Sequence, residues 1–345
     1  MESSEIAASP RGTTVGVVEV LPGLATCAAI AAMATAIGGW APLLGAAIPA
    51  VLIGVLIAVV RRPARLLMAG VTFASKFVLQ CAVVLLGAQL SIGAVVQVGV
   101  RSLPVMLISL AVCLLAAWAL GRALRIDSAV TTLIGVGTAI CGASAIAAVS
   151  PVIRARNSSV AYAVSTIFLF NVLAVVAFPF LGHALGMSPD AFGLLAGTAV
   201  NDTSSVVAAA SVYGAASLGV AVVVKLVRTL MIIPVSVGLA VVDARRRKNE
   251  PGFSVSKALT LVPWFLIGFV AVALLNSAGV IPPTTGEMLK EVSVFLVATA
   301  LAGIGLSTDL RAIRVAGWKP LILGAVLWIL VTATTLVTMT FCGYL

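Results

Sequence analysis

The chain has 345 residues, of which 61% are hydrophobic and 9% are charged, and its mean hydropathy is +1.22. So little polar surface excludes a soluble globule, and long apolar runs without two-residue alternation favour membrane helices over barrel strands. The formal net charge of +10 fits loops that face anionic lipid better than a nucleic-acid-binding surface. The composition therefore predicts an all-α polytopic membrane protein without a nucleic-acid partner.

Apolar windows predict eleven membrane spans after a polar N-terminal tail over residues 1–23. The spans are expected near Leu24 to Gly38, Leu44 to Val60, Leu66 to Leu90, Leu103 to Leu120, Ala129 to Val149, Val160 to Leu181, Phe192 to Tyr213, Leu218 to Val242, Ala258 to Leu275, Met288 to Leu306 and Leu321 to Phe341. Alternation from a cytoplasmic N-terminus puts 14 basic residues inside and 3 outside, which supports this orientation. Arg154 and Arg156 are on the outside under this count, unless they flank a segment that does not cross fully.

The fifth expected span contains a run of small and hydroxylated residues from Gly135 to Ser150. Gly137 and Gly142 weaken the helix, and a helix that breaks in the membrane frees backbone N–H groups that can bind an anion at a half-helix N-terminus. The alternative is close helix packing by small residues. The candidate binding residues here are Thr138, Cys141, Gly142, Ala143 and Ser144.

The seventh expected span repeats this outline sixty residues later, from Gly197 to Ala210, and adds five consecutive polar residues, Asn201 to Ser205. A carboxylate such as that of Asp202 costs roughly 2.5 to 3.5 kcal/mol near the bilayer centre, so we expect it to face a cavity, a cation or a proton path. Lys225 and Arg228 share one face of the next helix and are its expected partners. The alternatives are a structural ion pair, or cations that extend to the membrane interface.

A second similarity joins Leu90-Ser91 and Pro104 to Leu306-Ser307 and Pro320 at a constant offset of 216 residues. The spans before these two steps run in opposite directions under the assigned topology, which fits an inverted repeat. We therefore expect one transmembrane domain over 24–345, with repeat units near 44–182 and 190–342. If the two Gly-Thr-Ala stretches were full spans, they would run parallel and could not be the inverted pair.

Four segments resemble the sulfate exporter family of the YeiH type, whose members are bacterial inner-membrane proteins. They are GVGTAICGASAIAA from Gly135, GTAVNDTSSVVAAA from Gly197, VKLVRTLMIIPV from Val224 and LAGIGLSTDLRAIRVAGWKPL from Leu301. The resemblance implies a core domain with two discontinuous crossing helices, packed on a panel that offers a homodimer interface. It assigns the breaks to the fifth and tenth spans, at Gly137 to Ser144 and Gly303 to Thr308. The family more often has His where Asn201 stands, which leaves proton coupling open.

The expected function is secondary transport of a small anion, sulfate or an organosulfonate by preference, through alternating access. The expected binding residues are Thr138, Cys141, Gly142, Ala143, Ser144, Asn201, Thr203, Ser204, Ser307 and Thr308, with Asp202, Lys225 and Arg228 as the charged group. The alternatives are a cation/proton antiporter in which Asp202 titrates, or a non-saturating channel. The coupling ion is left open between a proton and sodium. Because the sequence holds neither a catalytic constellation nor a paired cysteine spacing, no enzyme, cofactor or metal is expected.

Overall fold

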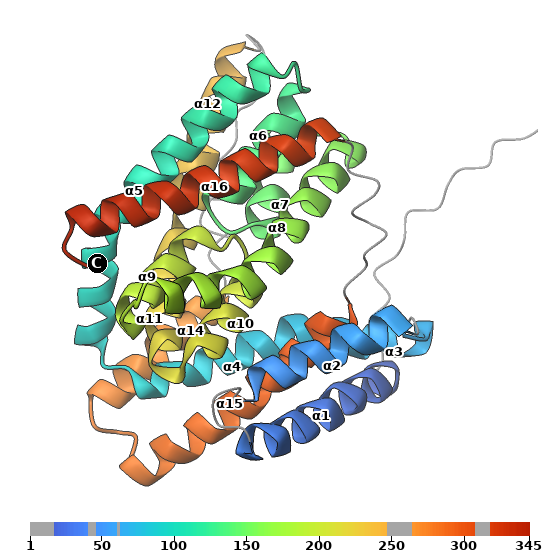
Figure 1. The fold of residues 1–345 in the computed structure, drawn as a ribbon, viewed down its shortest axis with the longest axis vertical. Helices are drawn as coiled ribbons and strands as arrows, with labels where there is room; N and C mark the ends of the chain where they lie inside the picture. Colours follow the sequence, from blue (N-terminus) through green and yellow to red (C-terminus); the bar gives the residue numbers. More distant parts are fainter. Residues whose placement is uncertain (1–16, 41–45, 61–62, 247–263, 308–317) are drawn as a thin grey trace, which may run out of the picture.

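The computed structural model describes residues 17–40, 46–60, 63–246, 264–307 and 318–345 (Figure 1). Over these residues the chain forms helices and no strand. Seven helical stretches are long and apolar enough to cross a membrane: Glu19–Trp40, Leu66–Gln89, Ile92–Ala123, Ser158–Ala184, Ala215–Val242, Thr284–Leu306 and Trp318–Phe341. The predicted all-α polytopic membrane protein is confirmed at this level.

The described helices follow the eleven predicted apolar segments, several of them in pieces. They are α1 Val17–Trp40, α2 Ala47–Val60, α3 Arg65–Phe73, η1 Ala74–Val78, α4 Leu79–Leu86, η2 Gly87–Gln89, α5 Ile92–Ala123, α6 Ser128–Ala139, α7 Ala143–Val152, α8 Asn157–Ala184, α9 Pro189–Ala199, α10 Thr203–Tyr213, α11 Ala215–Leu230, α12 Ile232–Arg246, α14 Trp264–Ser277, α15 Pro283–Leu306 and α16 Trp318–Phe341.

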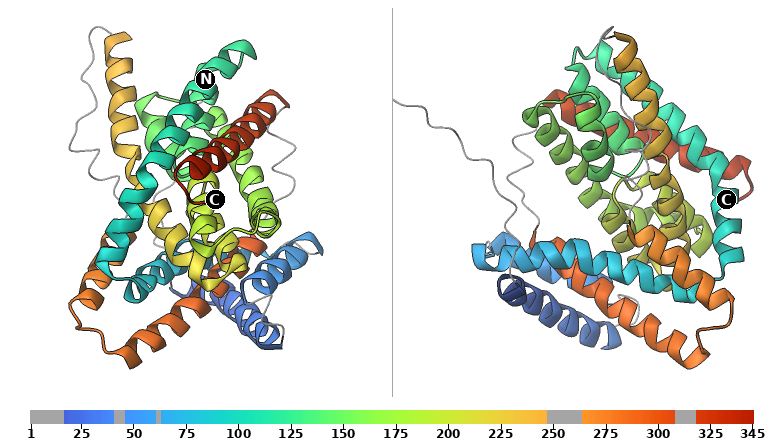
Figure 2. Two further views of the ribbon diagram at one scale, coloured as in Figure 1. Left: turned by 60° about the vertical axis from the view of Figure 1, so that its left-hand side comes forward. Right: turned by 180° about the vertical axis from the view of Figure 1, so that it is seen from behind.

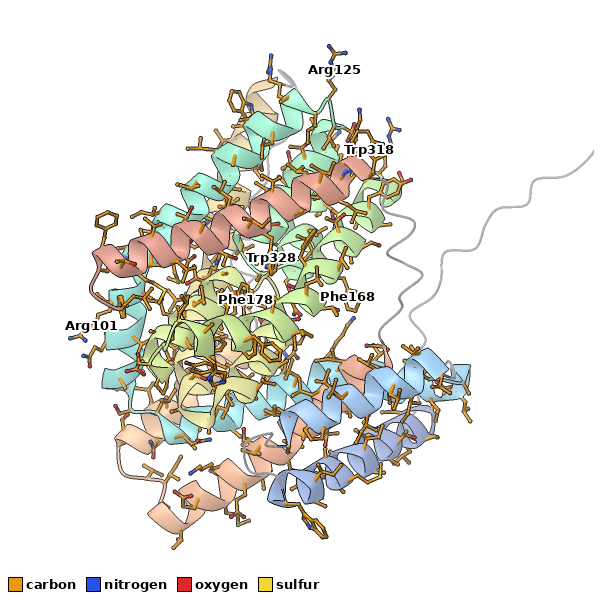
Figure 3. The ribbon with its side chains drawn as sticks, in the orientation of Figure 1. Arg101, Arg125, Phe168, Phe178, Trp318 and Trp328 are labelled. Atoms are coloured by element: carbon orange, nitrogen blue, oxygen red, sulfur yellow. The ribbon has the colours of Figure 1, made fainter. Side chains whose placement is uncertain are left out.

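The helices form two groups. In the first, α1, α2, α3, α4 and α15 pack together as a layer, with α14 along α4; in the second, α5 to α11 pack with α16, and α12 packs on α7 (Figures 1 and 2). Backbones approach very closely inside the layer, where a Cβ on Gly70 would lie 2.6 Å from the Cα of Gly23 and one on Gly305 would lie 2.9 Å from the Cα of Gly54. Aromatic stacking joins α8 to α16, with ring centroids of Phe178 and Trp328 5.6 Å apart (Figure 3).

The seventh predicted span is a hairpin and does not run through. Phe192 in the first turn of α9 stacks on Tyr213, the last residue of α10, with ring centroids 3.8 Å apart. Tyr213 also stacks on His183 near the end of α8 and donates a hydrogen bond to the Met187 carbonyl. Because α9 begins where α10 ends, both helices reach inward from the end at which α8 finishes.

The fifth predicted span is a second hairpin, and it enters from the other end of α8. Near the end of α5, Gly121 faces Thr131 in the first turns of α6, and α7 ends five residues before α8 begins. At the turn between α6 and α7, a Cβ on Gly137 or Gly142 would meet Ile167, which lies part-way along α8. Figure 1 shows α6 and α7 in the upper half of the second group and α9 and α10 in its lower half.

This arrangement corrects two predictions. The Gly-Thr-Ala stretches were expected to run parallel because each was counted as a crossing, but as hairpins they enter from opposite ends. The loop with Arg154 and Arg156 therefore lies at the same end as Arg122 and Arg125, which removes the discordant charges from the other end. The outcome matches the expectation that these two arginines flank a segment that does not cross fully.

The tenth predicted span is helical as far as Leu306, so its helix ends inside Gly303 to Thr308, the segment to which the resemblance assigned a break. The helix α15 is continuous over Pro283–Leu306, and Ser307 is its C-cap. Its two glycines serve close packing: a Cβ on Gly305 would lie 2.6 Å from the Val51 carbonyl, and one on Gly303 would lie 3.1 Å from the Val71 carbonyl. Thr308 lies outside the described residues, as does most of the segment after the Leu306-Ser307 step.

Candidate functional site at the hairpin tips

Each hairpin is built from two half-length helices joined by a three-residue turn. The four helices have 12, 10, 11 and 11 residues, so each is about 15 to 18 Å long, roughly half of a bilayer core. The turn Ile140 to Gly142 follows α6, and the turn Val200 to Asp202 follows α9. Gly142 has φ +67° and ψ −127°, a conformation open mainly to glycine, which explains why the first helix breaks there. The tips therefore lie near the level of the membrane centre.

Small residues on α9 bring α11 close enough to reach the tips. A Cβ on Gly193 or Gly197 would lie 2.7 Å from the side chain of Val220 or Val224 respectively, so the two helices pack in parallel without intervening side chains. Lys225 follows on α11 and is fully buried. Its ammonium donates to the Ile140 and Val200 carbonyls, at 2.8 Å each. One cation thus joins the two tips through equivalent positions, sixty residues apart.

Arg228, one turn further along α11, binds only the first hairpin. It is fully buried, and it donates through Nε to the Ala139 carbonyl at 2.6 Å and through Nη2 to the Thr138 carbonyl at 3.4 Å. A helix C-terminus carries a partial negative charge and unpaired carbonyls, so a cation is favourable there. Lys225 and Arg228 therefore compensate the C-terminal ends of α6 and α9.

Asp202 performs the opposite function at the start of α10. Its carboxylate accepts hydrogen bonds from the backbone N–H groups of Ser204 and Ser205 at 3.1 and 3.2 Å, and from their hydroxyls at 2.5 and 2.9 Å. This is an N-cap, and it compensates the positive end of the helix. The predicted ion pair with Lys225 or Arg228 is therefore replaced by capping, since both cations donate to backbone carbonyls.

The start of α7 differs from the start of α10. Its N-cap is Gly142, which has no side chain, and the described residues supply no side-chain cap there. Ala143 and Ser144, in the first turn, are exposed. Four half-helix ends thus meet at the tips, and three of them carry a compensating charged side chain. The remaining end is positive and accessible and has no side-chain cap, and Asp202 lies beside it, with its Cβ 3.3 Å from the place that a Cβ on Gly142 would take.

Several buried polar atoms near the tips have no hydrogen-bond partner within the described part of the chain. They are the hydroxyls of Thr138 and Thr198, both amide atoms of Asn201, and Nη1 of Arg228. These side chains are 0 to 2% exposed. A helical threonine usually donates to the carbonyl four residues back, as Thr166 does here. Unpaired buried polar groups are costly, which makes this cluster a candidate for ligand or water binding.

The structure brings most of the predicted residues together and separates Ser307 from them. Thr138, Cys141, Gly142, Ala143 and Ser144 form the tip of the first hairpin, and Asn201, Asp202, Thr203 and Ser204 form that of the second. Lys225 and Arg228 contact these tips from α11. Ser307 ends α15, whose main neighbours are α1, α2 and α4, and its hydroxyl donates to the Ile304 carbonyl. Thr308 lies outside the described residues.

Sequence reasoning missed the backbone carbonyls of Ala139, Ile140 and Val200, which bind the two cations, and the hydroxyls of Thr198 and Ser205. The signal was present in the sixty-residue offset, which pairs Ile140 with Val200 and Thr138 with Thr198. Treating that similarity as the repeat would have identified Ile140, Val200 and Thr198.

Comparison with known sequences places this chain in one family. Residues 22–324 match the family described as "Conserved hypothetical protein 698". A UPF0324 membrane protein of Streptococcus pneumoniae serotype 4 is 43% identical over 326 residues, which cover 93% of this chain and 97% of that protein. This chain belongs to the UPF0324 membrane protein family. A second member, M6_Spy0799 of Streptococcus pyogenes serotype M6, is 42% identical, and the match covers 92% of this chain and 95% of that protein. A third, SAG1125 of Streptococcus agalactiae serotype V, is 40% identical, and the match covers 90% of this chain and 94% of that protein.

No solved structure matches this UPF0324 chain. The names of these relatives describe membrane proteins and give no substrate.

Proposed function

We propose that this UPF0324 protein is a secondary transporter of a small anion, with sulfate or an organosulfonate as the preferred substrate. The substrate binds at the start of α7, where its negative charge takes the role that the Asp202 carboxylate has at the start of α10. The observation that carries the proposal is this difference between two otherwise equivalent hairpins: one N-terminus is capped by a carboxylate, and the other is uncapped and accessible.

The charge balance favours an anion. The tips hold two buried cations, Lys225 and Arg228, and one carboxylate, Asp202, so the charged side chains there sum to one positive charge. Backbone N–H groups of Ala143 and Ser144 and the unpaired Nη1 of Arg228 are candidate donors to oxyanion oxygens. Asn201 and the hydroxyls of Thr138 and Thr198 complete the proposed site.

Alternating access follows from the symmetry of the two hairpins. The first hairpin is followed by α8, and the second is followed by α11 and α12. The units α6–α7–α8 and α9–α10–α11–α12 form a candidate inverted repeat of about sixty residues. In this proposal the second helical group is the moving core and the layer of α1 to α4 and α15 is the panel, which would also carry any dimer interface. Either hairpin can give access from its own side. The membrane is proposed to be the bacterial inner membrane, with the N-terminus in the cytoplasm.

The cation/proton antiporter is the weaker alternative. Half-helix C-termini are the usual place for a coupling cation, but here the Ile140 and Val200 carbonyls already accept from Lys225. Asp202 accepts four hydrogen bonds from Ser204 and Ser205, which leaves its carboxylate poorly placed to bind a metal cation.

Flux measurements in proteoliposomes test the proposal. Purified protein should transport labelled sulfate with saturation, and a panel of unlabelled sulfonates and other small anions should compete. A pH change driven by a sodium gradient and indifferent to sulfate would instead support the antiporter. Flux that does not saturate would support a channel.

A further inference from the structure

A cavity of about 490 Å³ lies between α5, α6 and α12, away from the hairpin tips. Close packing of α5 on α6 forms one wall, because Gly121 lies directly against Thr131 and Gly135 lies against Ala117. The other wall is α12, which contributes Val235 and Leu239. Figure 2 shows α12 in tan at the left of its left panel, standing beside the upper part of α5.

The cavity is polar at one end and apolar along its length. The polar end is formed by Arg122 in the last turn of α5 and by Ser128 and Thr131 at the start of α6. Thr131 is 8% exposed, and its hydroxyl has no partner within the described part of the chain. The apolar length is lined by Leu114 and by the two α12 residues.

The cavity opens onto the apolar outer surface of the protein. Trp118 lines it and is 65% exposed, and its neighbour Leu115 is 67% exposed. Exposed side chains of this kind on a membrane helix face lipid, and tryptophan is enriched where acyl chains meet headgroups. The polar end lies at the basic end of the molecule, where Arg125 also lies (Figure 3). An occupant must therefore combine a negative charge with a hydrocarbon chain.

We propose that this cavity binds an acidic phospholipid, with the headgroup phosphate at Arg122, Ser128 and Thr131 and an acyl chain along Leu114, Val235 and Leu239. The single guanidinium supplies the charge, the exposed Ser128 hydroxyl supplies a donor, and α12 supplies the apolar wall. Since Thr131 and Val136 belong to α6, the bound lipid contacts the first hairpin and holds it against α12. The lipid site does not depend on the identity of the transported anion.

Quenching of tryptophan fluorescence by brominated lipid tests the proposal on the full-length protein in phosphatidylcholine bilayers. Acyl-brominated phosphatidylglycerol should quench more strongly than acyl-brominated phosphatidylcholine at equal mole fraction. The excess should disappear in Trp118→Phe, which leaves the other four tryptophans. Arg122→Gln should weaken the preference for phosphatidylglycerol about fivefold, the factor that corresponds to about 1 kcal/mol for one basic residue at the surface.

Arg125→Gln is the matched control, because it removes the same charge from the same end but does not line the cavity. It should keep the preference. Equal quenching by the two brominated lipids would overturn the proposal, as would an equal loss in both arginine variants. Displacement of the lipid signal by inorganic phosphate would also overturn it, because the cavity would then be a site for a free anion.

Discussion

A carboxylate introduced at the open end of α7 should occupy the position of the proposed substrate. Ser144 lies in the first turn of α7 and is exposed, so Ser144→Asp can be accommodated without disturbing the core. A negative charge in the first turn stabilises a helix by about 0.3 to 1 kcal/mol. Asp202 beside Gly142 opposes this gain, so the variant should remain folded, with an unfolding midpoint within about 3 °C of that of the parent protein.

The same carboxylate should repel the substrate. Two unit charges about 4 Å apart interact by about 1 kcal/mol in water and about 4 kcal/mol at an effective dielectric constant of 20. Because Ser144 is exposed, we set the repulsion at about 2 kcal/mol for each negative charge of the substrate. This energy corresponds to roughly thirtyfold weaker binding of a monoanion. Sulfate, with two charges, should be affected more strongly.

The assay is saturable uptake of labelled sulfate into proteoliposomes, with thermal unfolding measured on the same preparations. Ser144→Asn is the matched control, since it has nearly the same shape as the aspartate and no charge. It should keep flux within about twofold of the parent protein. If Ser144→Asp transported sulfate with the same half-saturation concentration as Ser144→Asn, the assignment of the anion to the start of α7 would be wrong.

Three further tests examine the parts of the site by thermal unfolding and flux. Asp202→Asn keeps an N-cap and should retain stability and most flux, whereas Asp202→Ala should lower the free energy of unfolding by about 1 to 2 kcal/mol. If both variants were stable and lost flux equally, Asp202 would act as a titrating carboxylate and not as a cap. Gly142→Ala should lower the free energy of unfolding by about 1 to 3 kcal/mol, because residue 142 has φ +67°. The control is Gly238→Ala in α12, where an added Cβ would meet nothing within 4 Å, and it should raise the free energy of unfolding by about 0.5 to 1 kcal/mol. Equal effects of the two substitutions would contradict a strained turn at Gly142. Lys225→Met leaves the buried Ile140 and Val200 carbonyls without a donor and should lower the free energy of unfolding by about 2 kcal/mol. An unchanged unfolding midpoint would show that the two carbonyls find other partners.

The positions of the apolar segments could be predicted from the sequence because hydropathy alone defines them. Each of the eleven predicted windows contains described helix, and the breaks near Gly142 and Asp202 fall inside the two polar stretches that were singled out. Hydropathy cannot tell a crossing from a hairpin, since both bury about 20 apolar residues. The charges of Arg154 and Arg156 carried that information, because a full span would place them on the side opposite to the other basic loops, whereas a hairpin places them on the same side.

The partners of the charged residues could not be predicted from composition. An aspartate beside two basic residues suggests an ion pair, but the half-helix ends offer stronger local partners: N–H groups for Asp202 and carbonyls for Lys225. The two glycines of the second break that the resemblance assigned lie within the described helix. Gly303 and Gly305 look like helix breakers in sequence, yet both face neighbouring backbones, which is the other use of glycine in membrane helices.

The most direct test of the anion site is anomalous diffraction from crystals of the full-length protein grown with selenate in place of sulfate. Our account predicts one strong anomalous peak within hydrogen-bonding distance of the Ala143 and Ser144 backbone N–H groups, and its loss in Ser144→Asp crystals. A selenate peak elsewhere in the second helical group, or no peak at a concentration that saturates transport, would contradict it.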